Sequence, residues 1–290
     1  MGVYPGFQPT SLPAVPGLEG VGHIVAVGDN VTNIHIGQKV VPFFIYGSDY
    51  CSKGNGSWQQ YIEMDAKLVF PVPDGVSDDA AVQFVVNPFT ALQMIKILNI
   101  PANEYLIQGA AGSALGKQVI QICKALNIRT INVVRRAEQI PELLALGADH
   151  VIVQSDDIPT KVKEITNSKL AYAGLDPVGG DLTIKLTGSI RNNGTLIIYG
   201  AMSGLTFTGS IIDALFRNVT VRGYWITADA MVMGIDKCHE LANELWSLIS
   251  SKKLTLESFA GKTYTIQQVK DAVIAHSQSG RNGKVLMSFH

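Results

Sequence analysis

The residues best suited to hold a charged ligand are the small ones from Gly109 to Gly116. They follow a short apolar run, Tyr105–Gln108, and precede a stretch with helical periodicity, which predicts a turn between a strand and a helix. Small residues let the backbone approach a pyrophosphate, and free amides at the helix start bind its charge. The turn is not a strict G-x-G-x-x-G, so it is a weak match by itself. The alternative is that these glycines only allow close packing of the strand and the helix and bind no ligand.

A pair of arginines stands where the adenosine end of such a ligand would lie. Arg135 comes 19 positions after Gly116 and follows the second predicted strand, where a dinucleotide fold meets the adenosine ribose. In an NAD site an Asp or Glu there accepts hydrogen bonds from the 2′-hydroxyl. Arg135 and Arg136 suit a 2′-phosphate instead and leave no carboxylate to repel it, so NADPH is favoured over NADH. The alternative is two arginines that solvate an exposed strand end.

The middle of the chain predicts the sheet that would position these residues. Short apolar runs alternate there with stretches of helical periodicity, which are long enough for parallel pairing. The predicted strands are Tyr105–Gln108, Thr130–Val134, His150–Val153, Ala171–Asp176, Thr195–Tyr199 and Val219–Gly223, and the helices between them include Gly116–Leu126 and Ile140–Leu146. Six strands alternating with helices predict an α/β fold with a doubly wound parallel sheet.

The two ends of the chain carry other patterns. Residues 14–70 are β-rich, Ser77 followed by two acids predicts a helix N-terminus, and Pro88 is expected to divide two helices. The runs that predict strands in the β-rich part are Ile24–Val27, Lys39–Phe44 and Tyr61–Met64. The predictions for the other end are an amphipathic helix over Ala230–Ile249, a strand leading into a helix over Tyr264–Val273, and a final strand over Lys284–Phe289.

Composition excludes several classes of protein. The 23 Lys and Arg residues nearly balance the 24 Asp and Glu residues, and a formal net charge of −1 gives no surface for a polyanion, so nucleic-acid binding is disfavoured. Apolar residues make up 47% of the chain and charged ones only 16%, which indicates a folded chain rather than disorder. No stretch predicts a membrane span or a signal peptide.

Cysteine usage bears on compartment and on metals. Cys51, Cys123 and Cys238 are isolated in the sequence, which is typical of a reducing compartment, so a cytoplasmic protein is expected. Structural zinc needs closely spaced thiolates, which three isolated cysteines do not supply. The six histidines form no sequence-local ligand set. No metal site is therefore predicted.

Motifs spread over nearly the whole chain give it a family resemblance. The superfamily β-domain signature is matched by Pro16–Gly22, Val27–Gly28 and Gly37, and the enoyl reductase branch by Gly56–Trp58 with Tyr61, Asn87–Ala91, Val178–Gly180, Tyr199–Ser203 and Tyr224–Trp225. The chain thereby resembles the zinc-free medium-chain dehydrogenase/reductases, in particular the 2-enoyl thioester reductases of mitochondrial-type fatty acid synthesis. Zinc alcohol dehydrogenases have a His at the position of Leu18, which further disfavours metal-dependent alcohol oxidation.

The resemblance implies a Rossmann domain, built on the doubly wound parallel sheet, inserted in a GroES-like β domain with the active cleft between the two. The implied boundaries are 1–85 for the first part of the GroES-like domain, 86–226 for the Rossmann NADP-binding domain and 227–290 for the second part. The family normally carries a longer stretch ahead of the segment around Tyr4, so the β domain is expected to be short at its N-terminus. The sequence leaves open whether this is natural or a matter of the start site.

The resemblance also implies binding residues, position by position. The implied cofactor contacts are Asn87, Gly112, Ser113, Ala114, Leu115, Arg135, Arg136, Tyr199, Gly200, Ala201, Met202, Tyr224, Trp225, Ile226 and Lys284. One departure follows the second strand, where the family usually has Arg-Asp-Arg and this chain has Arg-Arg-Ala at 135–137. The second basic residue is displaced by one position, so its contact with the phosphate stays open.

The implied reaction needs an acid as well as a hydride donor. Hydride addition to the β-carbon of an enoyl thioester leaves an enolate, which needs a hydrogen-bond donor at its oxygen and a proton for the α-carbon. The segment Gly2–Pro5 resembles the family segment that carries the active-site tyrosine, which implies a catalytic role for Tyr4. The alternative is a Tyr-Pro turn with an exposed ring. Trp225 is a candidate wall of the acyl pocket, with a core aromatic as the alternative.

Three functions are compatible with the sequence. The leading hypothesis is an NADPH-dependent reductase of trans-2-enoyl chains carried on coenzyme A or acyl carrier protein. An NADPH:quinone reductase of the same superfamily is the second, and an NADP-binding sensor or scaffold without turnover is the third. The resemblance implies a homodimer, paired through the sheet edge that the last predicted strands leave open.

Overall fold

The structure is a computed structural model that describes residues 9, 12–46, 55–256, 263–278 and 284–289. Two compact units divide the chain: unit 1 comprises Met1–Phe89 and Ile226–His290, and unit 2 comprises Thr90–Trp225. Unit 2 is thus inserted within unit 1, as the fold prediction requires. The exact domain boundaries implied by the resemblance, at residues 85/86 and 226/227, stay predictions.

Unit 2 contains one parallel sheet of six strands. Its order is β6-β5-β4-β7-β8-β9, so the first of its strands in the chain lies in the middle and the order reverses between β4 and β7. The strands are β4 (Tyr105–Gln108), β5 (Arg129–Val134), β6 (His150–Val153), β7 (Ala171–Asp176), β8 (Ile190–Ile198) and β9 (Thr220–Gly223). All five pairings are parallel, which confirms the prediction of a doubly wound sheet.

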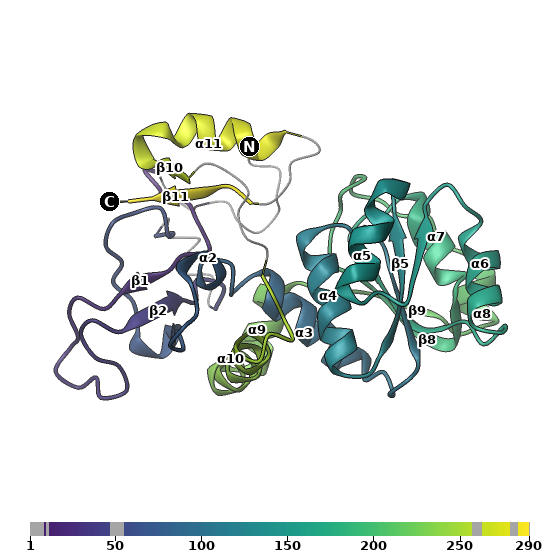
Figure 1. Cartoon of the computed structure of the whole chain (residues 1–290), viewed down its shortest axis with the longest axis horizontal. Helices are drawn as coiled ribbons and strands as arrows, with labels where there is room; N and C mark the ends of the chain where they lie inside the picture. Colours follow the sequence, from purple (N-terminus) through teal and green to yellow (C-terminus); the bar gives the residue numbers. More distant parts are fainter. Residues whose placement is uncertain (1–8, 10–11, 47–54, 257–262, 279–283, 290) are drawn as a thin grey trace. The chain divides into compact units, whose positions relative to one another are not determined.

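Helices cover both faces of this sheet (Figure 1). Those on one face are α4 (Ala114–Ala125) and α5 (Ile140–Leu146), the latter preceded by the short η2 (Ala137–Gln139), and those on the other are α6 (Ile158–Ile165), α7 (Asp181–Thr187) and α8 (Ile211–Leu215). Because successive strand residues point to opposite faces, Val133 packs with α6 and α7 while Val134 packs with α4 and α5. Each face therefore has its own apolar core.

Local signals set where these helices start and stop. Ser113 caps α4 by accepting a hydrogen bond from Gly116 N (3.1 Å), and Asp157 caps α6 by accepting one from Thr160 N (3.3 Å). Helix α5 ends at Leu146 and is capped by Gly147, whose φ of 107° lies in the left-handed region that glycine adopts without strain. The predicted α5 is confirmed to the residue, and α4 begins two residues earlier than predicted.

Helix α8 has its polar and apolar sides reversed. Its apolar side chains are exposed, from 63% for Ile212 to 79% for Ile211, and Phe216 just after the helix is 76% exposed. Asp213, between them in the sequence, is only 8% exposed. A surface helix normally presents the opposite arrangement.

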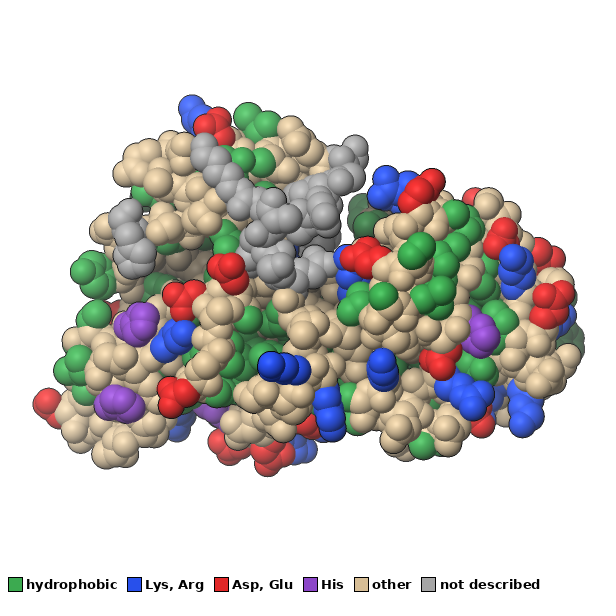
Figure 2. Space-filling view, viewed as in Figure 1, with side chains coloured by type: hydrophobic (Ala, Val, Ile, Leu, Met, Phe, Trp, Pro, Cys, Tyr) green, Lys and Arg blue, Asp and Glu red, His purple; other side chains and the backbone are tan. Residues whose placement is uncertain are grey.

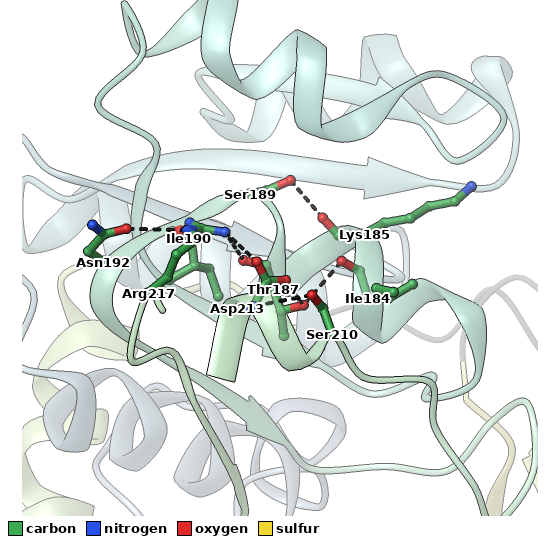
Figure 3. A network of polar contacts seen from close by, with 9 residues as sticks. All are labelled: Ile184, Lys185, Thr187, Ser189, Ile190, Asn192, Ser210, Asp213 and Arg217. Atoms are coloured by element: carbon green, nitrogen blue, oxygen red, sulfur yellow. Dashed lines mark hydrogen bonds and ion pairs between the residues drawn. The ribbon is translucent and has the colours of Figure 1, made fainter. Parts of the chain in front are cut away.

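A polar network accounts for this reversal (Figure 3). Asp213 accepts hydrogen bonds from Oγ1 of Thr187 in α7 (2.9 Å) and from Nη1 of Arg217 (2.7 Å). The Arg217 guanidinium also donates to the carbonyl of Ile190 at the start of β8 and to Oδ1 of Asn192 (3.2 Å). Because a buried carboxylate must be paired, this network fixes the polar side of α8 against the sheet and leaves its apolar side in solvent.

The described residues of unit 1 form two small sheets. The strands β1 (Gly22–His23), β2 (Lys39–Pro42) and β3 (Val69–Pro71) form an antiparallel sheet, and β10 (Thr263–Thr265) pairs in parallel with β11 (Leu286–Ser288). Its helices are η1 (Ala66–Leu68), α2 (Asp78–Ala81), α9 (Ile226–Met233), α10 (Ile235–Ser250), η3 (Ile266–Gln268) and α11 (Val269–Ser277), together with the first residues of α3 (Asn87–Leu98). The predictions of a strand at 39–44 and of the last strand, helix and strand are confirmed.

Aromatic side chains form the core of unit 1. Phe43, Phe70, Phe84 and Phe89 are at most 1% exposed, with ring centroids 4.9 to 6.4 Å apart in neighbouring pairs. Trp246 of α10 stacks on Phe84, with centroids 3.5 Å apart and the rings 4° from parallel. The cluster ties β2 and β3 to the start of α3 and to α10, although these segments are far apart in the sequence.

Three predictions for unit 1 were wrong. Ile24–Val27 and Tyr61–Met64 are not strands, and their side chains are largely exposed, because an alternating pattern supplies no partner strand. The single helix predicted over Ala230–Ile249 is divided into α9 and α10 at Gly234, whose φ is 86°. The division at Pro88 is confirmed: α2 ends at Ala81, and Pro88 lies in the first turn of the separate helix α3, where its missing N–H costs nothing.

The surface agrees with the near-zero net charge. On the face of unit 2 seen in Figure 2, Lys and Arg side chains are interspersed with Asp and Glu, without a large patch of either sign. None of the helices in the described part of the chain combines the length and the apolar character that a bilayer crossing requires.

Candidate functional site

Most of the predicted binding residues of unit 2 gather at one edge of its sheet. Gly112–Leu115 follow β4, Arg135 and Arg136 follow β5, Tyr199–Met202 follow β8, and Tyr224 and Trp225 follow β9. Since the strands are parallel, these segments all lie at the carboxyl edge. The strand order reverses between β4 and β7, and ligands of open α/β sheets bind beside such a reversal.

The three glycines of the turn after β4 have different structural roles. A methyl group on Gly109 would lie 2.8 Å from Cδ2 of Leu182, so this glycine allows α7 to pack close to β4. A methyl group on Gly116 would lie 2.6 Å from the carbonyl oxygen of Ala111, so this one lets α4 start directly against the turn. Gly112 lies against the side-chain amide of Gln139. Between them Ala110 has a φ of 44°, which makes the turn tight.

This turn presents unpaired backbone donors. Among the described residues, no hydrogen bond involves the N–H groups of Gly112, Ala114 or Leu115, whereas Gly116 N is bonded to Ser113 Oγ (3.1 Å). The three free N–H groups lie at the N-terminus of a 12-residue helix, whose dipole adds positive potential there. The turn can therefore bind an anion through its backbone, and the Ser113 hydroxyl serves to cap the helix.

Two exposed arginines follow β5. Arg135 is outside regular structure, and Arg136 is the residue just before η2, with extended backbone at φ −129° and ψ 134°. Their guanidinium groups stand free of ion pairs with the described residues. Both are thus available to a negatively charged ligand at the carboxyl edge.

Asp176, at the end of β7, was not among the residues predicted from the sequence. It is fully buried, and its Oδ1 accepts hydrogen bonds from Val178 N (2.8 Å) and Gly179 N (3.0 Å). Its Oδ2 accepts one from Thr183 Oγ1 of α7 (2.6 Å). The carboxylate thereby fixes the loop after β7 to the helix that follows. A single charged residue at the end of an apolar strand is the signal that was available in the sequence.

The loop held by Asp176 supports the segment after β8. Met202 N donates to Pro177 O (3.2 Å) and Ser203 N donates to Val178 O (2.9 Å). The Tyr199 hydroxyl is buried without a hydrogen-bond partner among the described residues, and burial, with a smaller contribution from Asp176, raises the pKa of this phenol. Tyr199 therefore stays protonated, and its hydroxyl is an unused donor at the carboxyl edge.

We expect the Asp176→Ala variant to be less stable by about 3 kcal/mol, because two buried donors and one partly buried donor would lose their acceptor. In a chain of this size that corresponds to a fall of about 6–12 °C in melting temperature. Asp181→Ala removes an exposed carboxylate bonded to Thr208 Oγ1 (2.9 Å) and is the matched control, with little change expected. Thermal and urea denaturation would measure both. Equal melting temperatures for Asp176→Ala and the unchanged protein would contradict the role given to this carboxylate.

The other predicted site residues belong to unit 1 or lie outside the described residues. Asn87 is the first residue of α3 and Ile226 the first of α9. Lys284 precedes β11 and pairs with Glu19 (Nζ to Oε2, 3.3 Å), while Oε1 of Glu19 accepts a hydrogen bond from Val86 N (3.2 Å). Tyr4 lies outside the described residues. The roles predicted for these residues stay predictions.

Two of the motif segments meet in unit 1. Gly56 N donates to Val15 O (2.8 Å), and Trp58 N donates to Pro16 O (2.9 Å). A methyl group on Gly56 would lie 2.6 Å from the carbonyl oxygen of Gly17, so the close approach depends on this glycine. The sequence motifs around residues 16 and 56 are therefore parts of one structural unit.

Metal ligands do not gather in the part of the chain that is described. Within it there is no group of three or more His, Cys, Asp or Glu side chains that could hold a metal ion. Cys51 lies outside this part. The absence of zinc stays a prediction from the sequence.

Family models match both units. The model of the alcohol dehydrogenase GroES-like domain matches residues 2–74, and that of the zinc-binding dehydrogenase matches residues 114–245. The first falls in unit 1 and most of the second falls in unit 2. The pair matches the predicted architecture of a Rossmann domain inserted in a GroES-like domain.

Individual proteins give the same classification. The mitochondrial enoyl-[acyl-carrier-protein] reductase of Caenorhabditis elegans is 34% identical over 259 residues, which cover 87% of this chain and 71% of the relative. A putative NADPH:quinone reductase from Bacillus thuringiensis has a similar structure, with a TM-score of 0.87 and 32% identity over 96% of this chain and 82% of that one. A mutant form of the enoyl thioester reductase from Candida tropicalis has a TM-score of 0.81 and 25% identity, over 95% and 80% respectively.

The chain therefore belongs to the medium-chain dehydrogenase/reductase family and is an oxidoreductase. Within that family it is similar to the enoyl reductases, as the motifs predicted. Its similarity to a quinone reductase is of the same order, so the family alone does not choose between the two substrates.

Proposed function

We propose that the protein reduces the double bond of trans-2-enoyl thioesters, carried on coenzyme A or acyl carrier protein, with NADPH as the reductant. The observation that carries the proposal is the anion-binding turn after β4 combined with two free arginines after β5 in a chain 34% identical to an enoyl reductase. Fatty acid synthesis is the process that we propose it serves.

The residues of unit 2 fit NADPH. The free N–H groups of Gly112, Ala114 and Leu115 suit the pyrophosphate, and Arg135 suits the phosphate on the adenosine ribose because no carboxylate stands beside it. NADPH, when bound, supplies the hydride. Arg136 adds charge at the same strand end, which favours NADPH further over NADH.

The protein's part in the reaction is to orient the substrate and to stabilise charge. Reduction at the β-carbon leaves negative charge on the thioester oxygen, and a phenol O–H that donates to this oxygen lowers the barrier. We assign that donor to Tyr4. A proton must then reach the α-carbon, from Tyr4 or from water.

The quinone reductase alternative is favoured by the structure from Bacillus thuringiensis. A direct comparison is NADPH oxidation with crotonyl-CoA against oxidation with an ortho-quinone. The proposal expects turnover of crotonyl-CoA to the saturated thioester, and turnover of the quinone alone would contradict it. Tight NADPH binding without reduction of any enal, enoyl thioester or quinone would leave the third function, a sensor or scaffold.

We further propose that two copies pair through the open edge of the six-stranded sheet. Strand β9 ends the sheet, and its outer edge has no partner strand among the described residues. The exposed apolar side of α8 belongs to the same unit, and the buried Asp213 network holds it outward. In a two-fold pair β9 would meet β9, which would extend the sheet and cover both edges.

We expect the Phe216→Asp variant to be monomeric, because a charge in the centre of the apolar contact would weaken pairing by at least about a hundredfold. Light scattering after size-exclusion chromatography would give the mass. The matched control is Leu144→Asp in α5, an exposed leucine on the opposite face of the sheet. A dimer that persists in Phe216→Asp, or a monomer in the unchanged protein, would contradict this mode of pairing.

A reducing compartment, the cytoplasm, is the location that we propose. Cys123 and Cys238 are free and buried. Cell fractionation with an antibody would test the location.

A further inference from the structure

The Gln139 side chain covers the turn that the proposed function assigns to the pyrophosphate. A methyl group on Gly112 would lie 2.8 Å from Cδ of Gln139 and closer still to its Nε2. The amide therefore rests directly on the glycine, although the two residues are well separated in the sequence. Neither composition nor spacing in the sequence indicates this contact.

The backbone around Gln139 is firmly placed. The residue ends η2 and precedes α5, and its N–H donates to Arg136 O (3.2 Å). The next residue, Ile140, packs into the apolar core between α4, α5 and the sheet. Helix α5 is also tied to α4 by the ion pair of Glu142 with Lys117 (2.6 Å). The backbone that carries this amide is therefore fixed beside the turn by the fold.

The hydrogen-bonding groups of this amide are unused. Gln139 does not cap α5 with its side chain, and no hydrogen bond joins that side chain to any other described residue. Beside it are the free N–H groups of Gly112, Ala114 and Leu115. A half-buried amide next to three unpaired donors favours a ligand that accepts several hydrogen bonds.

We propose that Gln139 is a cofactor-binding residue whose amide donates a hydrogen bond to the pyrophosphate of the dinucleotide. The proposal rests on the proposed function, since it takes the ligand of this turn to be a nicotinamide dinucleotide. The amide is neutral and lies on the glycine of the turn, so it contacts a group that NADPH and NADH share. Arg135, by contrast, is expected to act on the ribose phosphate that only NADPH carries.

The test compares dissociation constants of NADPH and NADH, measured by nucleotide fluorescence and calorimetry without a substrate. Gln139→Met keeps the length of the side chain over Gly112 and removes the amide. We expect it to weaken both nucleotides by about tenfold, the loss of roughly one hydrogen bond to a charged group. Arg135→Gln should weaken NADPH alone, and Gln278→Met, an exposed glutamine in unit 1, should change neither.

Each outcome of these measurements leads to a different conclusion about Gln139. Loss of NADPH affinity alone in Gln139→Met would overturn the pyrophosphate assignment and place the amide at the ribose phosphate. Unchanged or tighter binding would overturn the role itself, since the amide would then only cover the turn. If the unchanged protein bound neither nucleotide, the proposed function would be contradicted, and this inference, which depends on it, would be contradicted as well. Melting temperatures would show that each variant is folded.

Discussion

The Tyr4→Phe variant should reduce crotonyl-CoA about a hundredfold more slowly than the unchanged protein, with little change in the dissociation constant of NADPH. The phenol O–H is the group that we expect to donate to the enolate oxygen, and phenylalanine removes only that hydroxyl. A donor that acts in the transition state lowers kcat and kcat/KM together when it is lost. Tyr4 lies outside the described residues, so the prediction depends on the motif around it.

Steady-state kinetics with saturating NADPH would measure this effect. Tyr172→Phe is the matched control, because the Tyr172 ring contacts Arg191 (3.5 Å from the ring centroid to Cζ) in unit 2 and has no proposed part in the reaction. It should keep the full rate. An unchanged rate in Tyr4→Phe would remove this tyrosine from the mechanism, whatever the identity of the substrate.

The Gly116→Ala variant should be destabilised by about 3 kcal/mol and should bind NADPH at least about thirtyfold more weakly. The added methyl group would lie 2.6 to 2.8 Å from three backbone atoms of Ala111, and backbone cannot rotate away as a side chain can. Helix α4 would have to move off the turn. Its free N–H groups at Ala114 and Leu115 would then leave the positions that bind the pyrophosphate.

A second glycine in unit 2 provides the control. A methyl group on Gly209 would meet its nearest atom, in Phe207, at 3.9 Å, which is an ordinary contact. Gly209→Ala should therefore keep both its stability and its NADPH affinity. Denaturation curves and fluorescence titration of the two variants would decide. Normal NADPH binding by a folded Gly116→Ala protein would show that α4 does not have to meet the turn this closely.

The sheet of unit 2 was predictable because its central strands β4, β5 and β7 are largely buried runs rich in apolar residues. β4, β6 and β7 match the predicted limits, and the alternation with helices predicted the parallel order. The β-rich part of unit 1 was harder. Alternating residues such as those of Ile24–Val27 have the right pattern, but pairing depends on where other segments lie, which the pattern does not contain.

Some residues of the candidate site were likewise predictable from the sequence, and others were not. The turn after β4 and the arginines after β5 are local patterns, so their types and spacing could be interpreted directly. Asp176 and Gln139 act through contacts with Thr183 and Gly112 that depend on how helices pack on the sheet. A sequence alone does not supply such contacts. Ser113 lies between these two cases. Its position in the turn was predicted from the sequence, whereas the structure shows that its hydroxyl caps α4.

The outward-facing apolar side of α8 has a consequence for how association would occur. Asp213 and Arg217 already hold the helix in one orientation in the single chain, so a partner would not have to order it. Association normally loses part of its favourable free energy to the restriction of side chains and loops at the contact. A surface that is already rigid before binding loses less conformational entropy when two copies associate. Association through α8 would therefore be the docking of two preorganised surfaces.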